Sequence, residues 1–142
     1  QVLVSIGRRP NTQQLNLAEL GLEMNPQGIV IDEHMRTNIP GIFAIGDVTG
    51  KLMLAHTASA QALHVAEFLH QEKEGKPISI APLTYENIPR CVYTFPEEAS
   101  VGLTEAQAQE RGLAFQTGSF PFAANGKALA IILRIGCFFH SV

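Results

Sequence analysis

The sequence predicts an α/β fold followed by a smaller α+β segment, and three features of the chain carry this prediction. Val2–Ile6 is an apolar run interrupted only by Ser5, which is typical of a buried parallel strand. Ile42–Ile45 is a second short apolar strand, and it ends in Gly46-Asp47. Residues 55–74 then repeat apolar side chains at three- and four-residue steps, which predicts a long helix with one apolar face.

Shorter elements are predicted between the two strands. Leu15–Leu20 fits a short helix with Gly21 as its C-terminal cap. Pro26-Gln27-Gly28 has the composition of a turn, and Ile29–Asp32 that of a short strand. The apolar face of the long helix is rich in alanine, so we expect it to pack closely on a neighbour or a flat ligand; its members are Ala55, Ala58, Ala62, Val65, Ala66 and Leu69.

A linker-like stretch, residues 77–89, marks the expected domain boundary. Beyond it, Val92–Phe95 and Ala99–Leu103 are predicted strands. Thr104 and Gln107 form a capping box for a short helix through Arg111, which Gly112 caps. The last predicted features are a β-rich stretch at residues 115–122, a hairpin turn at Asn125-Gly126 and an apolar tail without clear periodicity at residues 131–142.

The composition narrows the classes of protein. Of the 142 residues, 46% are hydrophobic and the formal net charge is −3, so the chain lacks the basic surface of a nucleic-acid-binding protein. No apolar run approaches the ~20 residues of a membrane span. Gln1 opens no secretory signal and starts inside an apolar run, so we expect the chain to begin in mid-protein. Two cysteines are too few for a disulfide scaffold, and a reducing, cytoplasmic location is expected.

The Gly46-Asp47 pair is the strongest candidate for a binding site. A strand that ends at a glycine and a carboxylate places an acceptor at the edge where α/β sheets bind ligands. The glycine allows close approach of the backbone, and Asp47 can accept hydrogen bonds from sugar-like hydroxyls. The alternative is an ordinary strand-to-loop turn with Asp47 as an Asx-turn or helix-cap residue.

Four blocks then occur in order. They are Val2–Asn11, Thr37–Asp47 with its Ala44-Ile45-Gly46-Asp47 ending, Met53-Leu54-Ala55-His56, and a longer block from Tyr85 to Glu105. Together they resemble the FAD-dependent pyridine nucleotide–disulfide oxidoreductases from Val2 to about Ala130. The resemblance implies the end of a NAD-binding Rossmann-like domain at residues 1–11 and the C-terminal part of an FAD-binding domain at residues 12–80. It further implies a partial dimerisation domain at residues 81–142, of which residues 131–142 are a divergent tail.

The resemblance also implies cofactor contacts. Asp47 would bind a ribityl hydroxyl of FAD, and the helix start would face the flavin, where unpaired N–H groups stabilise negative charge. Gly7 would let the backbone contact NAD. The implied cofactor-binding residues are Gly7, Gly46, Asp47, Met53, Leu54, Ala55 and His56. The alternatives are a plain amphipathic helix and a solvated loop, and for Arg8 and Arg9 individually the solvated loop is favoured.

Within the family, the motifs are most similar to members that oxidise dihydrolipoamide with NAD⁺ through FAD and a redox disulfide. The resemblance implies a homodimer whose partner is the dihydrolipoamide-bearing acyltransferase of a 2-oxo acid dehydrogenase complex. No catalytic residue is predicted, because the family's redox cysteine pair, its His–Glu couple and every Gly-x-Gly-x-x-Gly turn are absent from these 142 residues. We therefore expect this chain alone to be inactive, to bind FAD weakly or not at all, and to be marginally stable.

Other reactive side chains receive no role. The spacing of His56, His64 and His70 does not suit metal ligands on one helix. Cys91 and Cys137 lie far apart and are expected to be inert core thiols. Two other interpretations stay open: part of a sibling reductase of glutathione or mercuric ion, or a truncated, non-catalytic module that dimerises or binds a partner.

Overall fold

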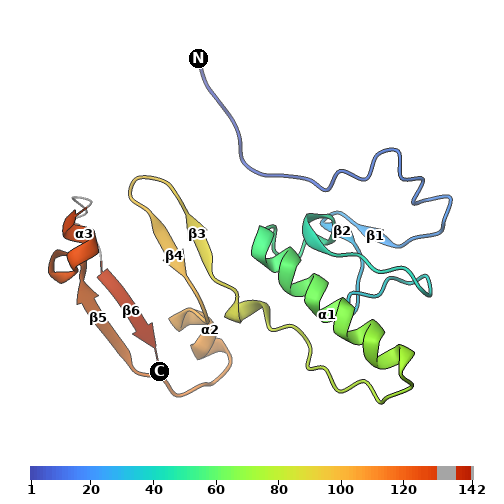
Figure 1. Cartoon of the computed structure of the whole chain (residues 1–142). Helices are drawn as coiled ribbons and strands as arrows, with labels where there is room; N and C mark the ends of the chain where they lie inside the picture. The colour runs from blue at the N-terminus through green and yellow to red at the C-terminus, as the bar shows by residue number, and fades with distance from the viewer. Residues whose placement is uncertain (131–136, 142) are drawn as a thin grey trace. The chain divides into compact units, whose positions relative to one another are not determined.

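The computed structural model describes residues 1–130 and 137–141, and the chain divides into two compact units, Gln1–Tyr85 and Glu86–Val142 (Figure 1). The division falls inside the linker-like stretch at residues 77–89. Helices and strands are mixed along the chain, as an α/β composition requires. The described strands form three two-stranded antiparallel sheets, so the parallel pairing expected from the apolar runs does not form among them.

The prediction of a buried strand at Val2–Ile6 is wrong. The segment is extended, and Val2, Leu3 and Ile6 are 90%, 92% and 94% exposed. Extended backbone becomes a strand only when a neighbour satisfies its N–H and C=O groups, and no described strand pairs with this segment. Figure 1 shows it in blue as a single trace without a neighbouring strand.

A helical turn and a small hairpin follow. The expected helix at Leu15–Leu20 is a single turn that ends in a Schellman motif, in which Leu22 N–H donates to Leu17 O at 3.0 Å and Gly21 N–H to Ala18 O at 3.1 Å. Gly21 has φ +69°, so the predicted cap is confirmed.

The predicted turn at Pro26-Gln27-Gly28 is also confirmed. It joins β1 (Met24–Asn25) to β2 (Gly28–Ile29), and Asn25 Oδ1 accepts the N–H groups of Gln27 and Gly28 at 2.9 Å each. The strand expected over Ile29–Asp32 is therefore earlier and shorter than predicted.

The strand expected at Ile42–Ile45 is reduced to one antiparallel bridge between Arg36 and Phe43. Ala44 N–H donates to Met35 O at 3.0 Å, so the segment folds back on the residues just before it. Gly41, with φ +79°, allows this reversal. A short loop closes at a lower entropic cost than a distant pairing, which accounts for the local contact in place of a parallel one.

The long helix α1 spans Ala55–Lys73 and confirms the prediction to within one residue. Its buried side chains are Thr57, Gln61, His64 and Phe68. The predicted apolar face is therefore wrong: Ala55, Ala62, Ala66 and Leu69 are exposed, whereas Ala58 and Val65 are half-buried. Hydrogen bonds and a ring contact satisfy two of the polar residues on the inner face, Gln61 and His64, which an apolar-periodicity rule does not register.

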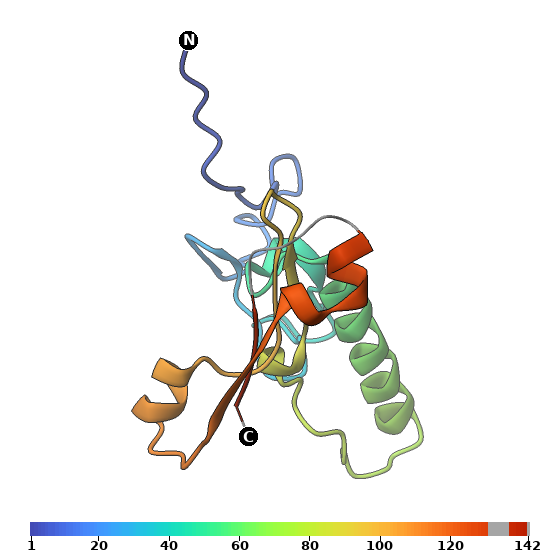
Figure 2. The same ribbon diagram turned by 90° about the vertical axis from the view of Figure 1, so that its left-hand side faces the viewer.

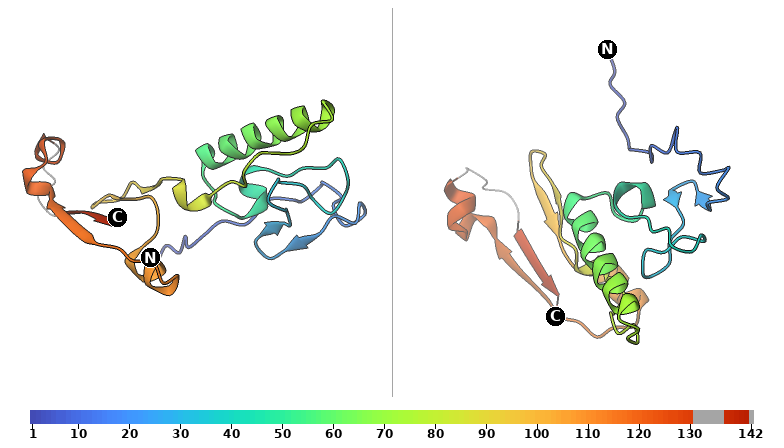
Figure 3. Two further views of the ribbon diagram at one scale, coloured as in Figure 1. Left: turned by 90° about the horizontal axis from the view of Figure 1, so that it is seen from below. Right: turned by 45° about the vertical axis from the view of Figure 1, so that its right-hand side comes forward.

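The core of the first unit lies beneath the hairpin. Leu22, Ile29 and Ala44 are buried there, with further apolar side chains against them: Leu17, Ile31, Ile39, Ile42 and Val48. The 3-10 helix η1 (Gly46–Thr49) follows this core and contacts both β2 and α1. Figure 3 shows η1 beside the N-terminal half of α1.

The second unit contains two hairpins and short helices. The 3-10 turn η2 (Tyr85–Asn87) begins at the division between the units. Next along the chain, β3 (Arg90–Val92) pairs with β4 (Glu98–Ser100). The strands predicted at Val92–Phe95 and Ala99–Leu103 are therefore displaced toward the N-terminus. Helix α2 (Glu105–Glu110) carries the predicted capping box of Thr104 and Gln107.

The β-rich stretch contains β5 (Thr117–Pro121), which pairs with β6 (Cys137–Ser141) from Thr117↔Ser141 to Pro121↔Cys137 (Figure 2). Between them lie η3 (Phe122–Ala124) and α3 (Gly126–Ala130). The hairpin turn expected at Asn125-Gly126 is wrong, because Asn125 Oδ1 accepts the Ala128 N–H at 3.0 Å and begins α3. Part of the predicted tail, residues 131–136 and 142, lies outside the described residues.

Few side chains are buried in the described part of the second unit, where the buried apolar residues are Ile88, Ala108 and Ala128. Tyr93 and Phe95 are 84% and 92% exposed. Such a small core fits the expectation of marginal stability. No helix among the described residues combines the length and the apolar character that crossing a membrane requires.

Candidate functional site

Arg8 brings the predicted motif segments together. Its Nη2 donates to Met53 O at 2.7 Å, and its Nη1 lies 3.5 Å from Asp47 Oδ2. The loop after Gly7, the Gly46-Asp47 turn and the start of α1 therefore meet at one guanidinium. The Arg8 side chain is 65% exposed, in keeping with the solvated-loop interpretation, although it also makes these contacts. The Asp47 side chain is 55% exposed, and an ion pair so exposed contributes only about 0–1 kcal/mol.

Gly46 and Asp47 open η1. Gly46 has φ +76°, a conformation that favours glycine, and its N–H donates to Gln61 Oε1 at 2.6 Å. The Asp47 side chain makes no capping bond, because the N-cap residue is Ile45 and η1 has no side-chain cap. The alternative of an Asx-turn or cap role for Asp47 is therefore not what the structure has: its half-exposed carboxylate faces Arg8 and solvent.

The start of α1 has no side-chain cap at its N-cap residue. Leu54 is the N-cap of α1 and supplies no side-chain hydrogen bond, and no acidic residue lies in the first turn. Met53 and Leu54 are half-buried, and Ala55 and His56 are exposed. The first N–H groups of a helix lack intrahelical acceptors and carry a partial positive charge, so this end of α1 favours an anionic or electron-rich group.

Two buried polar residues of α1 support this region, and the sequence interpretation missed both. Gln61 is fully buried, accepts the Gly46 N–H and donates through Nε2 to Tyr85 Oη at 2.9 Å. Thr57, one turn earlier, is also fully buried, and its Oγ1 has no hydrogen-bond partner among the described residues. Their spacing of four residues on one face was the available signal, but polar residues are normally assigned to the solvent side.

Gly7 lies in the exposed N-terminal segment with φ +153°, and nothing lies within 4 Å of a Cβ built on it. Its backbone is therefore open to a ligand on the side where a side chain would stand. Arg9 is exposed, in keeping with the solvated-loop interpretation.

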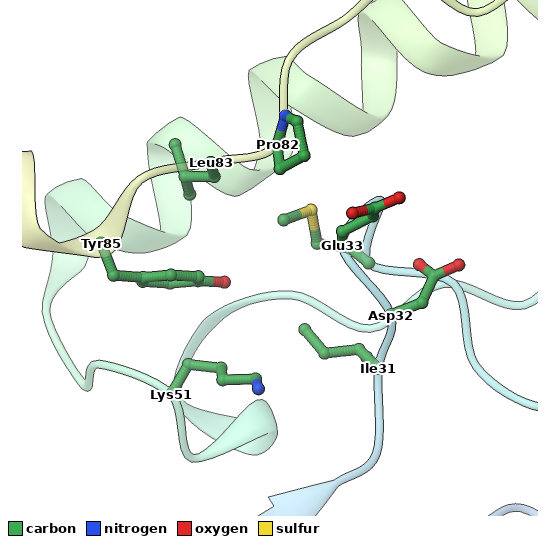
Figure 4. A pocket seen from close by; sticks show the side chains of 8 residues that line it. Ile31, Asp32, Glu33, Lys51, Pro82, Leu83 and Tyr85 are labelled. Carbon is green, nitrogen blue, oxygen red and sulfur yellow. The ribbon is translucent and has the colours of Figure 1, made fainter.

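A small pocket of about 270 Å³ lies elsewhere in the first unit (Figure 4). The carboxylates of Asp32 and Glu33 lie on one side and the Lys51 ammonium on the other, with Pro82, Leu83 and Tyr85 completing the wall. It is smaller than most ligand pockets, which hold roughly 300–1,000 Å³, and none of the predicted cofactor-binding residues lines it.

The remaining reactive residues form no candidate metal site in the described part of the chain. Among residues 1–130 and 137–141, no group of three or more His, Cys, Asp or Glu side chains could hold a metal ion. His64 is buried and His70 is exposed, so the two are unrelated, as expected. Cys91 is an exposed free thiol on β3, which corrects its assignment as a core residue; the side chain of Cys137 lies outside the description.

The chain belongs to the pyridine nucleotide-disulphide oxidoreductase family. The sequence model of that family matches residues 1–62, and the model of the family's dimerisation domain matches residues 88–134, so together they match more than half of the chain. The resemblance inferred from the four blocks is thereby confirmed.

Among curated proteins, the chain is similar to a dihydrolipoyl dehydrogenase of Bacillus subtilis, at 48% identity over 131 residues, and to a mitochondrial dihydrolipoyl dehydrogenase of Canis lupus familiaris, at 44% over 128 residues. These alignments cover 92% and 89% of this chain but 26% and 24% of the relatives. The chain thus spans about a quarter of the length of the curated relatives it matches.

Solved structures give the same family. LpdA from Mycobacterium tuberculosis aligns with a TM-score of 0.76 and 29% identity, over 96% of this chain and 29% of that one. The HOCl-induced flavoprotein disulfide reductase RclA from Escherichia coli aligns with a TM-score of 0.72 and 27% identity, over 97% of this chain and 31% of that one.

Proposed function

We propose that this chain supplies flavin-facing and nicotinamide-facing segments, and the start of the dimer interface, of an oxidoreductase that oxidises dihydrolipoamide to lipoamide with NAD⁺. The observation that carries the proposal is the meeting of three motif segments at Arg8, in a chain 48% identical to a dihydrolipoyl dehydrogenase. The proposed parts are residues 1–11 at the end of the NAD-binding domain, 12–80 in the FAD-binding domain and 81–142 in the dimerisation domain.

The residues present fit two parts of FAD. The half-exposed Asp47 carboxylate offers acceptor oxygens to ribityl hydroxyls, and positive φ at Gly46 lets the backbone approach the same chain of hydroxyls. The uncapped start of α1 suits the electron-rich end of the isoalloxazine ring. The proposed flavin-facing residues are Gly46, Asp47, Met53, Leu54, Ala55 and His56.

When bound, FAD supplies the relay of electrons between a dithiol and nicotinamide. The residues of this chain bind and orient the cofactors. Asp47 fixes the sugar-like chain, the first N–H groups of α1 stabilise charge near the ring, and Gln61 holds the Gly46 N–H so that the turn keeps its shape. Arg8 links the nicotinamide-side loop to Asp47 and to Met53 at the start of α1. Gly7 offers its open backbone to NAD.

The match of residues 88–134 to a dimerisation domain supports a homodimer. The acyltransferase of a 2-oxo acid dehydrogenase complex is the proposed partner of the parent enzyme, and the cytoplasm its proposed location. A sibling glutathione or mercuric reductase is less well supported, because the curated relatives at 44–48% identity are dihydrolipoyl dehydrogenases.

The test reads the coding sequence on both sides of this segment and assays the whole open frame. We expect two Gly-rich turns and a cysteine pair four residues apart upstream, a His–Glu couple downstream, and NAD⁺ reduction by dihydrolipoamide. Flanks without these parts would favour the non-catalytic binding or dimerisation module. Turnover by the 142-residue chain alone would contradict the assignment of the missing catalytic parts to other segments.

A further inference from the structure

Two histidines form a hydrogen-bonded pair inside the first unit. His34 Nδ1 and His64 Nε2 lie 2.9 Å apart, and the rings stack with centroids 5.2 Å apart at 22°. His64 is buried on the inner face of α1, and His34 is half-buried on the loop at residues 32–36. The contact therefore joins two parts of the chain that are 30 residues apart.

The contact depends on protonation. One facing nitrogen must donate and the other must accept, so the hydrogen bond forms when the pair is neutral or carries a single extra proton. A second extra proton gives both facing nitrogens an N–H and both rings a positive charge. The hydrogen bond is then lost and the two rings repel each other at close range.

The surroundings favour the uncharged form of His64. Burial of the ring lowers the pKa of His64, the neighbouring His34 lowers it further, and Asp32 opposes these effects. The Phe68 ring lies 5.1 Å from His34 and adds apolar surface, while the Arg36 guanidinium lies 5.4 Å from the Phe68 centroid.

The other charged groups nearby are already engaged or distant. Asp32 accepts from Arg36 Nε at 2.7 Å, and Glu33 Oε1 lies 3.9 Å from His34 Nε2, where it can attract one proton. On α1, Glu67 Oε1 accepts from Gln71 Nε2 at 2.9 Å. Among the described residues, Glu33 is the carboxylate that lies within ion-pair distance of His34, and one carboxylate does not compensate two positive rings.

We propose that His34 and His64 form a pH-sensitive contact, which holds residues 32–44 against α1 until both facing nitrogens are protonated and then releases them. The same segment leads into Gly46-Asp47, so its release loosens the turn of the candidate site. The inference goes beyond the proposed function and does not depend on it, because the contact involves this chain alone.

The test follows both rings by NMR in the full chain and compares its unfolding with that of two variants. We expect the pKa of His64 to lie below its ordinary value of 6.5, because the ring is buried and faces His34. Because the folded-state pKa of His64 is lowered, its contribution to stability is complete above 6.5 and is lost as pH falls toward the folded-state value.

The variant His64→Gln removes the titrating ring. The variant His70→Gln is the matched control, because His70 is an exposed histidine of the same helix. Between about pH 7.5 and pH 5.5, the wild type and His70→Gln should lose stability with a similar slope, and His64→Gln should give a flatter profile. If the pKa of His64 is not lowered from its ordinary value, the pair is not formed in solution and the proposal is wrong. Equal slopes for the two variants would also overturn it.

Discussion

Gln61→Leu should destabilise the first unit through one specific loss. Gln61 is fully buried, accepts the Gly46 N–H at 2.6 Å and donates to Tyr85 Oη at 2.9 Å. Leucine is of similar size but provides neither group. Gly46 is half-buried, so its N–H is only partly rescued by water, and the loss of this partner should cost about 1–2 kcal/mol. Tyr85 is also half-buried, and its hydroxyl should add roughly 0.5 kcal/mol.

Urea unfolding of the full chain measures this difference as a lower midpoint at an unchanged slope. Tyr85→Phe is the matched control, because it removes the second hydrogen bond and leaves the Gly46 N–H bonded to Gln61. We expect Gln61→Leu to lower stability clearly more than Tyr85→Phe. Equal effects of the two variants, or no effect of Gln61→Leu, would refute the assignment of Gln61 as the residue that holds Gly46.

Four further substitutions are tested by the same unfolding measurement. Gly28→Ala should cost roughly 3 kcal/mol, because the new Cβ overlaps the Val48 carbonyl oxygen. Gly21→Ala, at φ +69° with open space around it, should cost about 1 kcal/mol. Similar costs for the two variants would contradict the assignment of the larger cost to the overlap at Gly28. Phe68→Ala should cost roughly 3–4 kcal/mol, since its ring is 3% exposed and contacts aromatic neighbours; a cost below about 1 kcal/mol would mean that α1 is not held there. Thr57→Val should be neutral or stabilising by up to about 1 kcal/mol, because it replaces an unpartnered buried hydroxyl, and a clear destabilisation would reveal a partner for Oγ1.

Local signals in the sequence predicted local structure well. The capping box at Thr104, the cap at Gly21 and the turn at Pro26-Gln27-Gly28 all depend on neighbouring residues, and all three form. These three features need no distant partner, so their stability is set by the residues that the pattern contains. The long helix forms over the predicted residues, but the face that it buries is not the predicted one.

Signals that need distant partners failed. Val2–Ile6 requires neighbouring strands that the described residues do not provide, and Ile42–Ile45 pairs instead with the segment just before it. The inner face of α1 was misassigned because Gln61 and His64 are buried through polar contacts, which hydrophobic periodicity assigns to solvent.

The same limit applies to the candidate site. Asp47 and the start of α1 were predicted from motifs, whereas Arg8 was assigned to solvent. Its contact with Met53 spans 45 residues, and no local pattern indicates it. Motif order predicted the family, and only the three-dimensional structure revealed which side chain joins the motifs.

We propose that this chain carries the flavin-contacting segments of a dihydrolipoyl dehydrogenase. The most direct test replaces the aligned 131 residues of the Bacillus subtilis enzyme with those of this chain and measures bound FAD and NAD⁺ reduction by dihydrolipoamide. We expect a dimer that retains FAD and activity, and that loses most of its FAD when Asp47 is replaced by alanine. A folded dimer without FAD, or one whose FAD is unaffected by Asp47→Ala, would contradict it.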